Sequence, residues 1–377
     1  MRITMLIPAT FGLILAASQA SPVTAQAAPA AKPVPADPAA ALAVEQGEGR
    51  AVANKLADDL VSSFVYRDQA KAYAAMLRKN AAAGRYDSGT RGELAKLLTD
   101  DLQSVHKDGH LHVMLAPPVG ERERGGGGGR PKNWPALIQS AKTIAPGIGY
   151  IRFTAFMGRD EEMAALRKWL ADNRDAKTLI FDLRNHHGGG LDEQDAIFSY
   201  VYGSKTPLVK MAISKDIYDR RGSPVEAGPT LVYAAVGDQM VATHSAIPGE
   251  DTALRKAKIY LLTSNRSASA AEHFALALKS TGRATLIGEA TAGANHFGGG
   301  QPINEHFAVW MPIGRTYDIK TGKDWEGDGI APDIAVDPKL ALVTALERAG
   351  LSHEEAVRLD ALEVPAEPVH SDKLKAR

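Results

Sequence analysis

The sequence predicts an α/β fold that follows a small helical subdomain. From about residue 149 onward, short apolar runs suited to strands alternate with segments of helical periodicity. Ahead of that region, residues 50–106 carry apolar side chains at helical spacing. Hydrophobic residues make up 45% of the chain and charged residues 23%, which is ordinary for a globular protein with a buried core.

Three helices are expected in residues 50–106. Val52, Leu56, Leu60 and Phe64 recur every four residues and form one apolar stripe. Similar stripes run through 70–77 and 94–105, and the residues between them, 84–88, include turn formers. These helices should pack together as a small bundle.

The α/β region is justified by its succession of short elements. Strands are expected at 111–115, 150–153, 178–183, 258–263 and 285–288, and helices at 163–170, 192–202 and 270–279. The run at 178–183 is almost wholly apolar, as in parallel strands that are covered on both faces. Residues 339–363 should be mostly helical, with a polar tail beyond them.

The N-terminus has the pattern of an export signal. Arg2 precedes an apolar stretch, Met5 to Ala17, that is short for a membrane span, and small-x-small sites follow at residues 18–20 and 25–27. We expect a signal peptide at 1–27, an Ala/Pro-rich linker at 28–46, and a periplasmic or secreted mature protein with no membrane span. An uncleaved anchor is the alternative.

Charge and cysteine content exclude several classes of function. Lys plus Arg and Asp plus Glu both number 44, so nothing indicates a nucleic-acid partner. The absence of cysteine excludes disulfides, a cysteine nucleophile and thiolate zinc sites. The composition does not determine the oligomeric state.

Three segments carry side chains or glycines suited to chemistry. In residues 263–272, a strand ends in small residues and a helix begins near Ser269, where free N–H groups favour an anion. The glycines at 188–190 follow a buried strand and can donate N–H groups, although a tight turn explains them equally. The acidic segment 324–333 is not an EF-hand, because Ala335 stands where a glutamate is needed.

Together these segments resemble the tail-specific (C-terminal processing) serine proteases. The resemblance rests on three segments: Asp-Leu-Arg at 182–184 with the glycines at 188–190, Ser-Ala-Ala-Glu at 269–272, and the stretch Gly288 to Gly293. Asp-Gly-His at 108–110 and residues 325–333 are typical of the branch that contains the interphotoreceptor retinoid-binding protein and the tricorn protease core. The resemblance implies a crotonase-like spiral of βα units, with a helical subdomain at 47–107, a catalytic domain at 108–340 and C-terminal helices and tail at 341–377.

The resemblance also implies a mechanism and its residues. Ser269 is the expected nucleophile, with Ser267 as the rival if the register differs by two. His110 is the expected base and Glu326 its orienting carboxylate, and the oxyanion would meet the N–H groups of Ala270 and of Gly188 or Gly189. No cofactor is implied, and the partner would be a peptide or protein substrate.

The chain departs from the family pattern at several positions. Many members use a lysine base where Ala294 stands, so a Ser-Lys dyad is not expected. His186 and His187 replace residues that are usually asparagine and a small side chain. Only some 40 residues separate His110 from Tyr150, too few for the PDZ domain that many members carry.

Three other functions remain open at the level of sequence. The scaffold could bind hydrophobic ligands without catalysis, or hydrolyse small esters or amides by the same machinery. Histidines at 106, 110, 112, 186 and 187 could instead hold zinc, in which case a chelator would abolish activity.

Overall fold

The computed structural model describes residues 38–116 and 136–363. The predicted signal peptide, most of the predicted linker and the polar tail lie outside these ranges, as does a separate run of five glycines at 125–129. Within them, every helix is too short or too polar to cross a bilayer.

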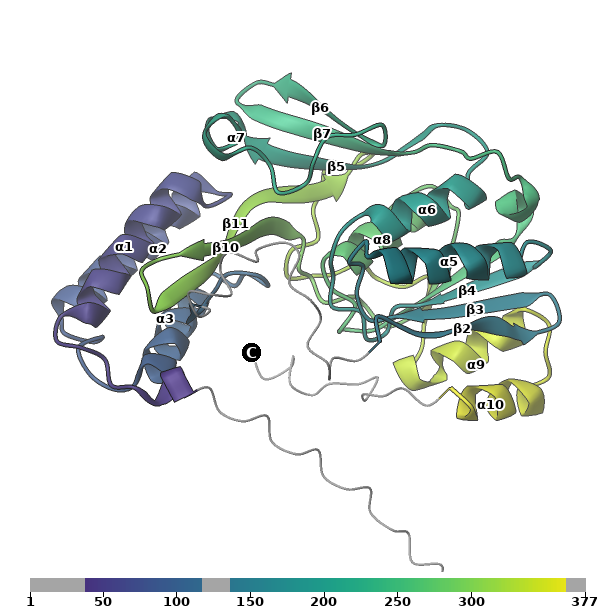
Figure 1. Cartoon of the computed structure of the whole chain (residues 1–377), viewed down its shortest axis with the longest axis horizontal. Coiled ribbons are helices and arrows are strands. Elements are labelled where there is room, and N and C mark those ends of the chain that lie inside the picture. The colour runs from purple at the N-terminus through teal and green to yellow at the C-terminus, as the bar shows by residue number, and fades with distance from the viewer. Residues whose placement is uncertain (1–37, 117–135, 364–377) are drawn as a thin grey trace, which may run out of the picture. The chain divides into compact units, whose positions relative to one another are not determined.

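A six-stranded sheet forms the main scaffold (Figure 1). Its order is β12-β9-β8-β4-β3-β2, and its strands are β2 (Ile138–Ala145), β3 (Ile148–Phe153), β4 (Thr178–Asp182), β8 (Lys258–Thr263), β9 (Thr285–Gly288) and β12 (Ile334–Ala335). All neighbours are parallel except β2, which pairs antiparallel with β3. β4 and β8 are adjacent, so the two loops that follow them emerge at the same edge of the sheet.

Helices cover both faces of this sheet. One face packs against α5 (Asp160–Asp172), α6 (Asp192–Val201) and α8 (Ala270–Ser280). The other packs against α9 (Ala341–Arg348) and α10 (His353–Ala361). Phe181 of β4 belongs to the first core and Ile180 to the second, as the alternation of side chains along a strand requires.

A second, antiparallel sheet was not predicted from the sequence. It has the order β1-β11-β5-β7-β6, with β10 also paired to β11. Its strands are β1 (His112–Leu115), β5 (Thr206–Ser214), β6 (Leu231–Val236), β7 (Gln239–Ala246), β10 (His296–Pro302) and β11 (Phe307–Asp318), and α7 (Lys215–Arg221) follows β5.

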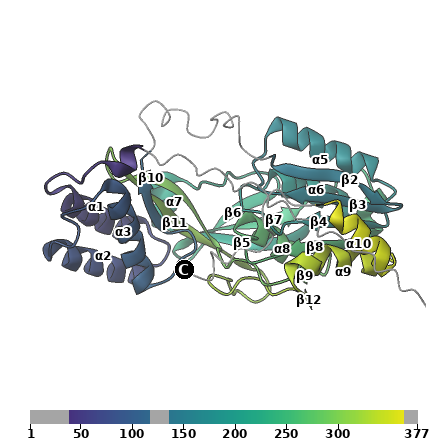
Figure 2. The same ribbon diagram turned by 90° about the horizontal axis from the view of Figure 1, so that it is seen from below.

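The helices α1 (Glu48–Ser63), α2 (Arg67–Ala82) and α3 (Arg91–Val105) lie at the three predicted apolar stripes. Their shared core also contains Phe307, Val309 and Met311 of β11, and Figure 2 shows the β10–β11 hairpin beside them. A capping box at Thr90 and Glu93 begins α3. β1 follows α3 and pairs with β11, which brings the Asp-Gly-His segment to this hairpin.

The end of the predicted linker has structure of its own. Pro38–Ala41 forms a short 3₁₀ helix, and the Val44 N–H donates to the Gly89 carbonyl at 3.0 Å. Residues 38–46 therefore pack against the turn that precedes α3.

Candidate active site

Ser269 lies at the turn between β8 and α8, with an unusual backbone. Its φ is 57° and its ψ is −115°, and it is the only non-glycine residue with positive φ in the described ranges. Such conformations persist where surrounding contacts enforce them, and they concentrate at functional sites. A sharp strand-to-helix turn of this kind is also how other serine hydrolases present a nucleophile.

Ser267, the rival nucleophile, is committed to structural hydrogen bonds. It is fully buried, its hydroxyl donates to the Leu183 carbonyl at 2.7 Å, and its oxygen accepts the Ser264 N–H at 3.0 Å. These bonds join the loop after β8 to the end of β4. The geometry therefore favours Ser269 as the reactive serine.

The predicted oxyanion-hole glycines lie beside Ser269. A Cβ placed on Gly188 would approach the Ser269 Cβ to 2.9 Å and its Oγ to 3.3 Å, so only glycine fits. Hydrogen bonding holds the two loops together, because the Ala268 N–H donates to the His186 carbonyl at 2.9 Å.

The N–H groups around this point differ in their availability. The Gly188 N–H donates to the His186 Nδ1 at 3.1 Å. Over the residues that the structure describes, the N–H groups of Gly189 and Ala270 have no hydrogen-bond acceptor. Those two donors are therefore free to meet an anion at the start of α8.

Glu272 holds the backbone of the Ser269 turn through hydrogen bonds. This role was not among the predictions from sequence. Its fully buried carboxylate accepts the N–H groups of Ser269, Gly293 and Ala294 at 2.8–2.9 Å and the Thr291 hydroxyl at 2.6 Å. Burial raises the pKa of Glu272 to about 7 despite these hydrogen bonds. Its place in the first turn of a helix that begins with serine is the sequence signal of a capping interaction.

His110, the predicted base, lies in the turn before β1 and stacks on Trp310 of β11. The ring centroids are 4.5 Å apart with an interplanar angle of 23°. Its Nδ1 is buried without a hydrogen-bond partner, and burial lowers the pKa of His110 to about 4. The imidazole is therefore neutral near pH 7, as a general base must be.

The structure brings the His110 segment to the Ser269 turn through shared neighbours. A Cβ on Gly109 would lie 2.8 Å from that of Ala294, whose own N–H donates to Glu272 beneath Ser269. No direct hydrogen bond joins Ser269 to the His110 imidazole in the described chain.

Glu326, the predicted orienting carboxylate, contacts the backbone beside His110. Its Oε1 accepts the Gly109 N–H at 2.7 Å, and its Oε2 accepts the Asn295 N–H at 2.8 Å. Among the hydrogen bonds of the described residues, none joins this carboxylate to the His110 ring. Glu326 thus fixes the turn that carries His110, and burial raises the pKa of its carboxyl.

His296 is a further buried histidine, and it lies outside the sequence motifs that mark the other site residues. Its Nδ1 lies 2.7 Å from Asp108 Oδ2 and 3.6 Å from Glu326 Oε2. These three side chains are the only cluster in the described ranges whose residue types and proximity could suit a metal ion. A separation of 2.7 Å is a hydrogen bond, whereas two ligands on a tetrahedral zinc at about 2.0 Å each would stand clearly farther apart.

The five histidines considered as zinc ligands are used in other ways. His106 Nε2 contacts the Gln69 side-chain amide and His112 Nδ1 contacts the His110 carbonyl. His186 packs against Phe156, and His187 lies at the surface with its Nε2 3.5 Å from Arg266. They do not assemble into a metal group within the described residues.

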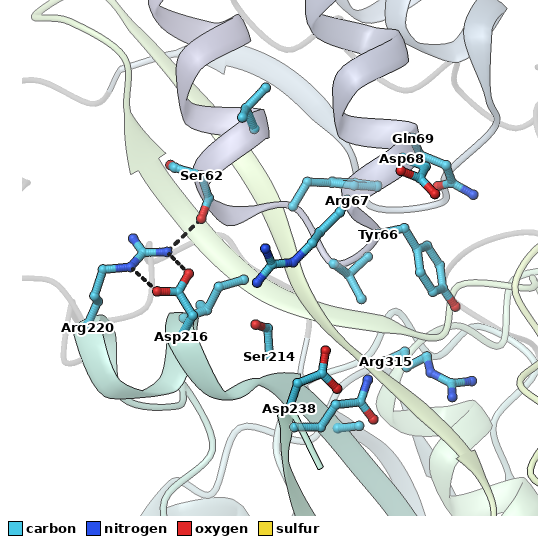
Figure 3. A pocket seen from close by; sticks show the side chains of 16 residues that line it. Ser62, Tyr66, Arg67, Asp68, Gln69, Ser214, Asp216, Arg220, Asp238 and Arg315 are labelled. Carbon is cyan, nitrogen blue, oxygen red and sulfur yellow. Dashed lines mark hydrogen bonds and ion pairs between the residues drawn. The ribbon is translucent and has the colours of Figure 1, made fainter. Parts of the chain in front are cut away.

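A polar cavity of about 570 Å³ lies next to this region (Figure 3). The residues Phe64 and Tyr66 line it, and their rings also pack edge-on against His296. Neither Ser269, His110 nor Glu326 lines the cavity, so it is distinct from the site of the predicted chemistry.

Comparison with curated proteins yields relatives that process C-termini. A chloroplastic C-terminal processing peptidase of Tetradesmus obliquus is 26% identical over 213 residues, which cover 55% of this chain and 40% of that protein. The chloroplastic carboxyl-terminal-processing peptidase 1 of Arabidopsis thaliana is 26% identical over 188 residues, which cover 49% of this chain and 33% of that protein. The chain thus spans two fifths or less of the length of these relatives.

Solved structures share the fold. A photosystem II D1 C-terminal processing protease aligns with a TM-score of 0.51 at 15% identity, covering 79% of this chain and 95% of that one. A candidate peptidase from Parabacteroides merdae aligns with a TM-score of 0.55 at 18% identity, covering 83% and 96%. Residues 147–336 match peptidase family S41, and this range contains both Gly188–Gly190 and Ser269. The chain belongs to that family.

Proposed function

We propose that this protein is a serine-type peptidase that hydrolyses peptide bonds through an acyl-enzyme formed on Ser269. The observation that carries the proposal is the strained backbone of Ser269 beside Gly188, at the start of α8. Membership of family S41 supports the same chemistry.

In this mechanism His110 removes the proton from the Ser269 hydroxyl as it attacks the substrate carbonyl. The N–H groups of Ala270 and of Gly188 or Gly189 stabilise the oxyanion, with Gly189 the glycine whose N–H is already free. His110 then protonates the leaving amine, and water releases the acyl group. Glu326 supports His110 through the Gly109 N–H.

The proposal also includes the predictions from sequence about fold type, domain bounds and export. We infer a crotonase-like spiral, a helical subdomain at 47–107, a catalytic domain at 108–340, and export by the signal peptide to the periplasm or beyond. The substrate would be a peptide or protein. The non-catalytic and zinc alternatives have less support, because the Ser269 turn is strained and the histidines have other partners.

Labelling with a fluorophosphonate probe tests the nucleophile. We expect wild type to be labelled, and Ser269→Ala to lose labelling while remaining folded. Ser267→Ala should still be labelled but should unfold at lower temperature, because it leaves the buried Ser264 N–H without an acceptor at a cost of about 1–3 kcal/mol. The Leu183 carbonyl keeps the His186 N–H as a donor. A chelator should leave the labelling of wild type unchanged.

Two results would overturn the proposal. Labelling that survives in Ser269→Ala but disappears in Ser267→Ala would move the nucleophile. Folded wild type that neither reacts with the probe nor cleaves a peptide library would favour a binding protein.

A further inference from the structure

His296 joins three segments that are distant in the sequence. It begins β10, and its Nδ1 lies against Asp108, which precedes β1, and Glu326, which follows β11. All three side chains are largely buried, and His296 itself is 1% exposed. A histidine placed in this way can carry a proton shared with Asp108 and a charge that balances two carboxylates.

These two carboxylates hold the backbone of the turn that carries His110. Asp108 Oδ1 accepts the N–H groups of His110 at 2.8 Å and Leu111 at 2.9 Å. Glu326 Oε1 accepts the Gly109 N–H at 2.7 Å. Three consecutive N–H groups thus end on acceptors that both lie beside His296.

Without a cation between them, Asp108 and Glu326 would repel each other in a buried setting. Burial alone lowers the pKa of His296, but its hydrogen bond to Asp108 and the charges of Asp108, Glu326 and Asp324 outweigh that effect and raise it. Burial alone would raise the pKa of Asp108, but its hydrogen bonds and the charge of His296 outweigh that effect and lower it.

Aromatic rings fix the orientation of the His296 imidazole. Phe64 and Tyr66 pack edge-on against it, with ring centroids at 6.5 and 5.3 Å. Its Nε2 is buried without a partner, so the ring makes its polar contacts through Nδ1 alone. The ring therefore presents one donor to the carboxylates and no group to a substrate.

We propose that His296 is a positioning residue, whose imidazolium clamps Asp108 and Glu326 so that the Gly109–His110 turn presents the catalytic base to Ser269. The inference rests on the proposed function. It predicts that loss of His296 slows the chemical step more than it weakens substrate binding, because the base moves while the substrate contacts remain.

The test compares His296→Leu and His296→Asn with matched substitutions at His306. His306 also donates from Nδ1 to a carboxylate, Glu48 Oε1, at 2.7 Å, but it lies at the far end of the same hairpin. Leucine removes both the donor and the charge, whereas the asparagine amide keeps a donor near the position of Nδ1. Steady-state peptide hydrolysis and the rate of probe labelling are measured for the folded fraction of each variant.

We expect His296→Leu to lower kcat about a hundredfold with KM nearly unchanged, and His296→Asn to recover part of that loss. Both His306 variants should keep the kcat of wild type. Activity of His296→Leu equal to that of His306→Leu, or a change confined to KM, would overturn the inference.

Amide hydrogen exchange tests the clamp without relying on catalysis. The amides of Gly109, His110 and Leu111 should exchange faster in His296→Leu than in wild type or in His306→Leu. If wild type proves inactive but exchange responds in this way, the proposed function fails while the clamp itself stands. If exchange at these three amides does not change, the clamp is wrong whatever the activity.

Discussion

At the scale of single residues, the backbone of Ser269 carries strain that its neighbours maintain. A side chain held in such a conformation costs about 1–3 kcal/mol. Glu272 offsets this cost by accepting the Ser269 N–H at 2.9 Å and tying the same carboxylate to Gly293 and Ala294. The helix start and the segment 291–295 thus form one unit around the serine.

His186 should make the protein sensitive to acid. It is fully buried, its Nδ1 accepts the Gly188 N–H, and burial lowers its pKa to about 3. Below its unfolded pKa of about 6.5, the unfolded chain takes up a proton that the folded chain cannot, so stability falls as pH falls. Between pH 7.5 and pH 5, this group alone should lower the free energy of unfolding by about 2 kcal/mol.

Replacing His186 by Asn should remove that part of the acid sensitivity. Urea unfolding at both pH values measures it, with the exposed neighbour His187→Asn as the control. We expect His187→Asn to lose as much stability as wild type on acidification and His186→Asn to lose less. Equal losses in all three proteins would mean that His186 is protonated in the folded state.

At the scale of elements, the turn after β4 depends on glycines at particular positions. Gly188 has a φ of 110°, and a Cβ there would approach Ser269 to 2.9 Å. Gly190, two residues later, has no positive φ, and its added Cβ would meet its nearest neighbour at an ordinary 3.5 Å. Gly190→Ala therefore controls for the addition of a methyl group to this turn, without the positive φ of Gly188 or its contact with Ser269.

We expect Gly188→Ala to slow probe labelling more than about tenfold, because the added methyl group displaces the Ser269 side chain. Gly190→Ala should be labelled at close to the wild-type rate. Labelling rates are compared at equal folded fraction, judged by circular dichroism. Normal labelling of Gly188→Ala would show that the turn can move away from Ser269.

The elements that could be predicted from sequence are those with strong local patterns. The strands at 258–263 and 285–288 match β8 and β9, because buried parallel strands read as short apolar runs. β5 and β10 were missed for local reasons: β5 contains Pro207 and Lys210, and β10 contains three consecutive glycines. These residues are unfavourable in strands, and pairing with β11 overrides that preference.

The candidate site was predictable in its segments but not in its contacts. Motifs located Ser269, Gly188 and Glu326, and the structure brings their loops together. The hydrogen bond of Glu326 to Gly109 spans 217 positions, and that of His296 to Asp108 spans 188. Such pairs depend on how β1, β10 and β11 assemble, which local periodicity does not encode.

At the scale of the whole molecule, Asp182 ties the main sheet to the C-terminal helices. Its buried carboxylate accepts from Arg152, Arg184 and Tyr150 at 2.7–3.0 Å. The two arginines in turn donate to the carbonyls of Glu363 and Pro338. The Asp-Leu-Arg motif is therefore a structural junction as well as the approach to the glycine run.

Asp182→Asn should destabilise the protein by about 3–5 kcal/mol, because it leaves two buried guanidinium groups without a carboxylate partner. Asp172→Asn is the matched control, since its ion pair with Lys168 is exposed and should contribute about 0–1 kcal/mol. Urea unfolding at neutral pH gives both values. A small effect of Asp182→Asn would mean that water or another anion reaches the arginines, and that their bonds to the Glu363 and Pro338 carbonyls do not depend on Asp182.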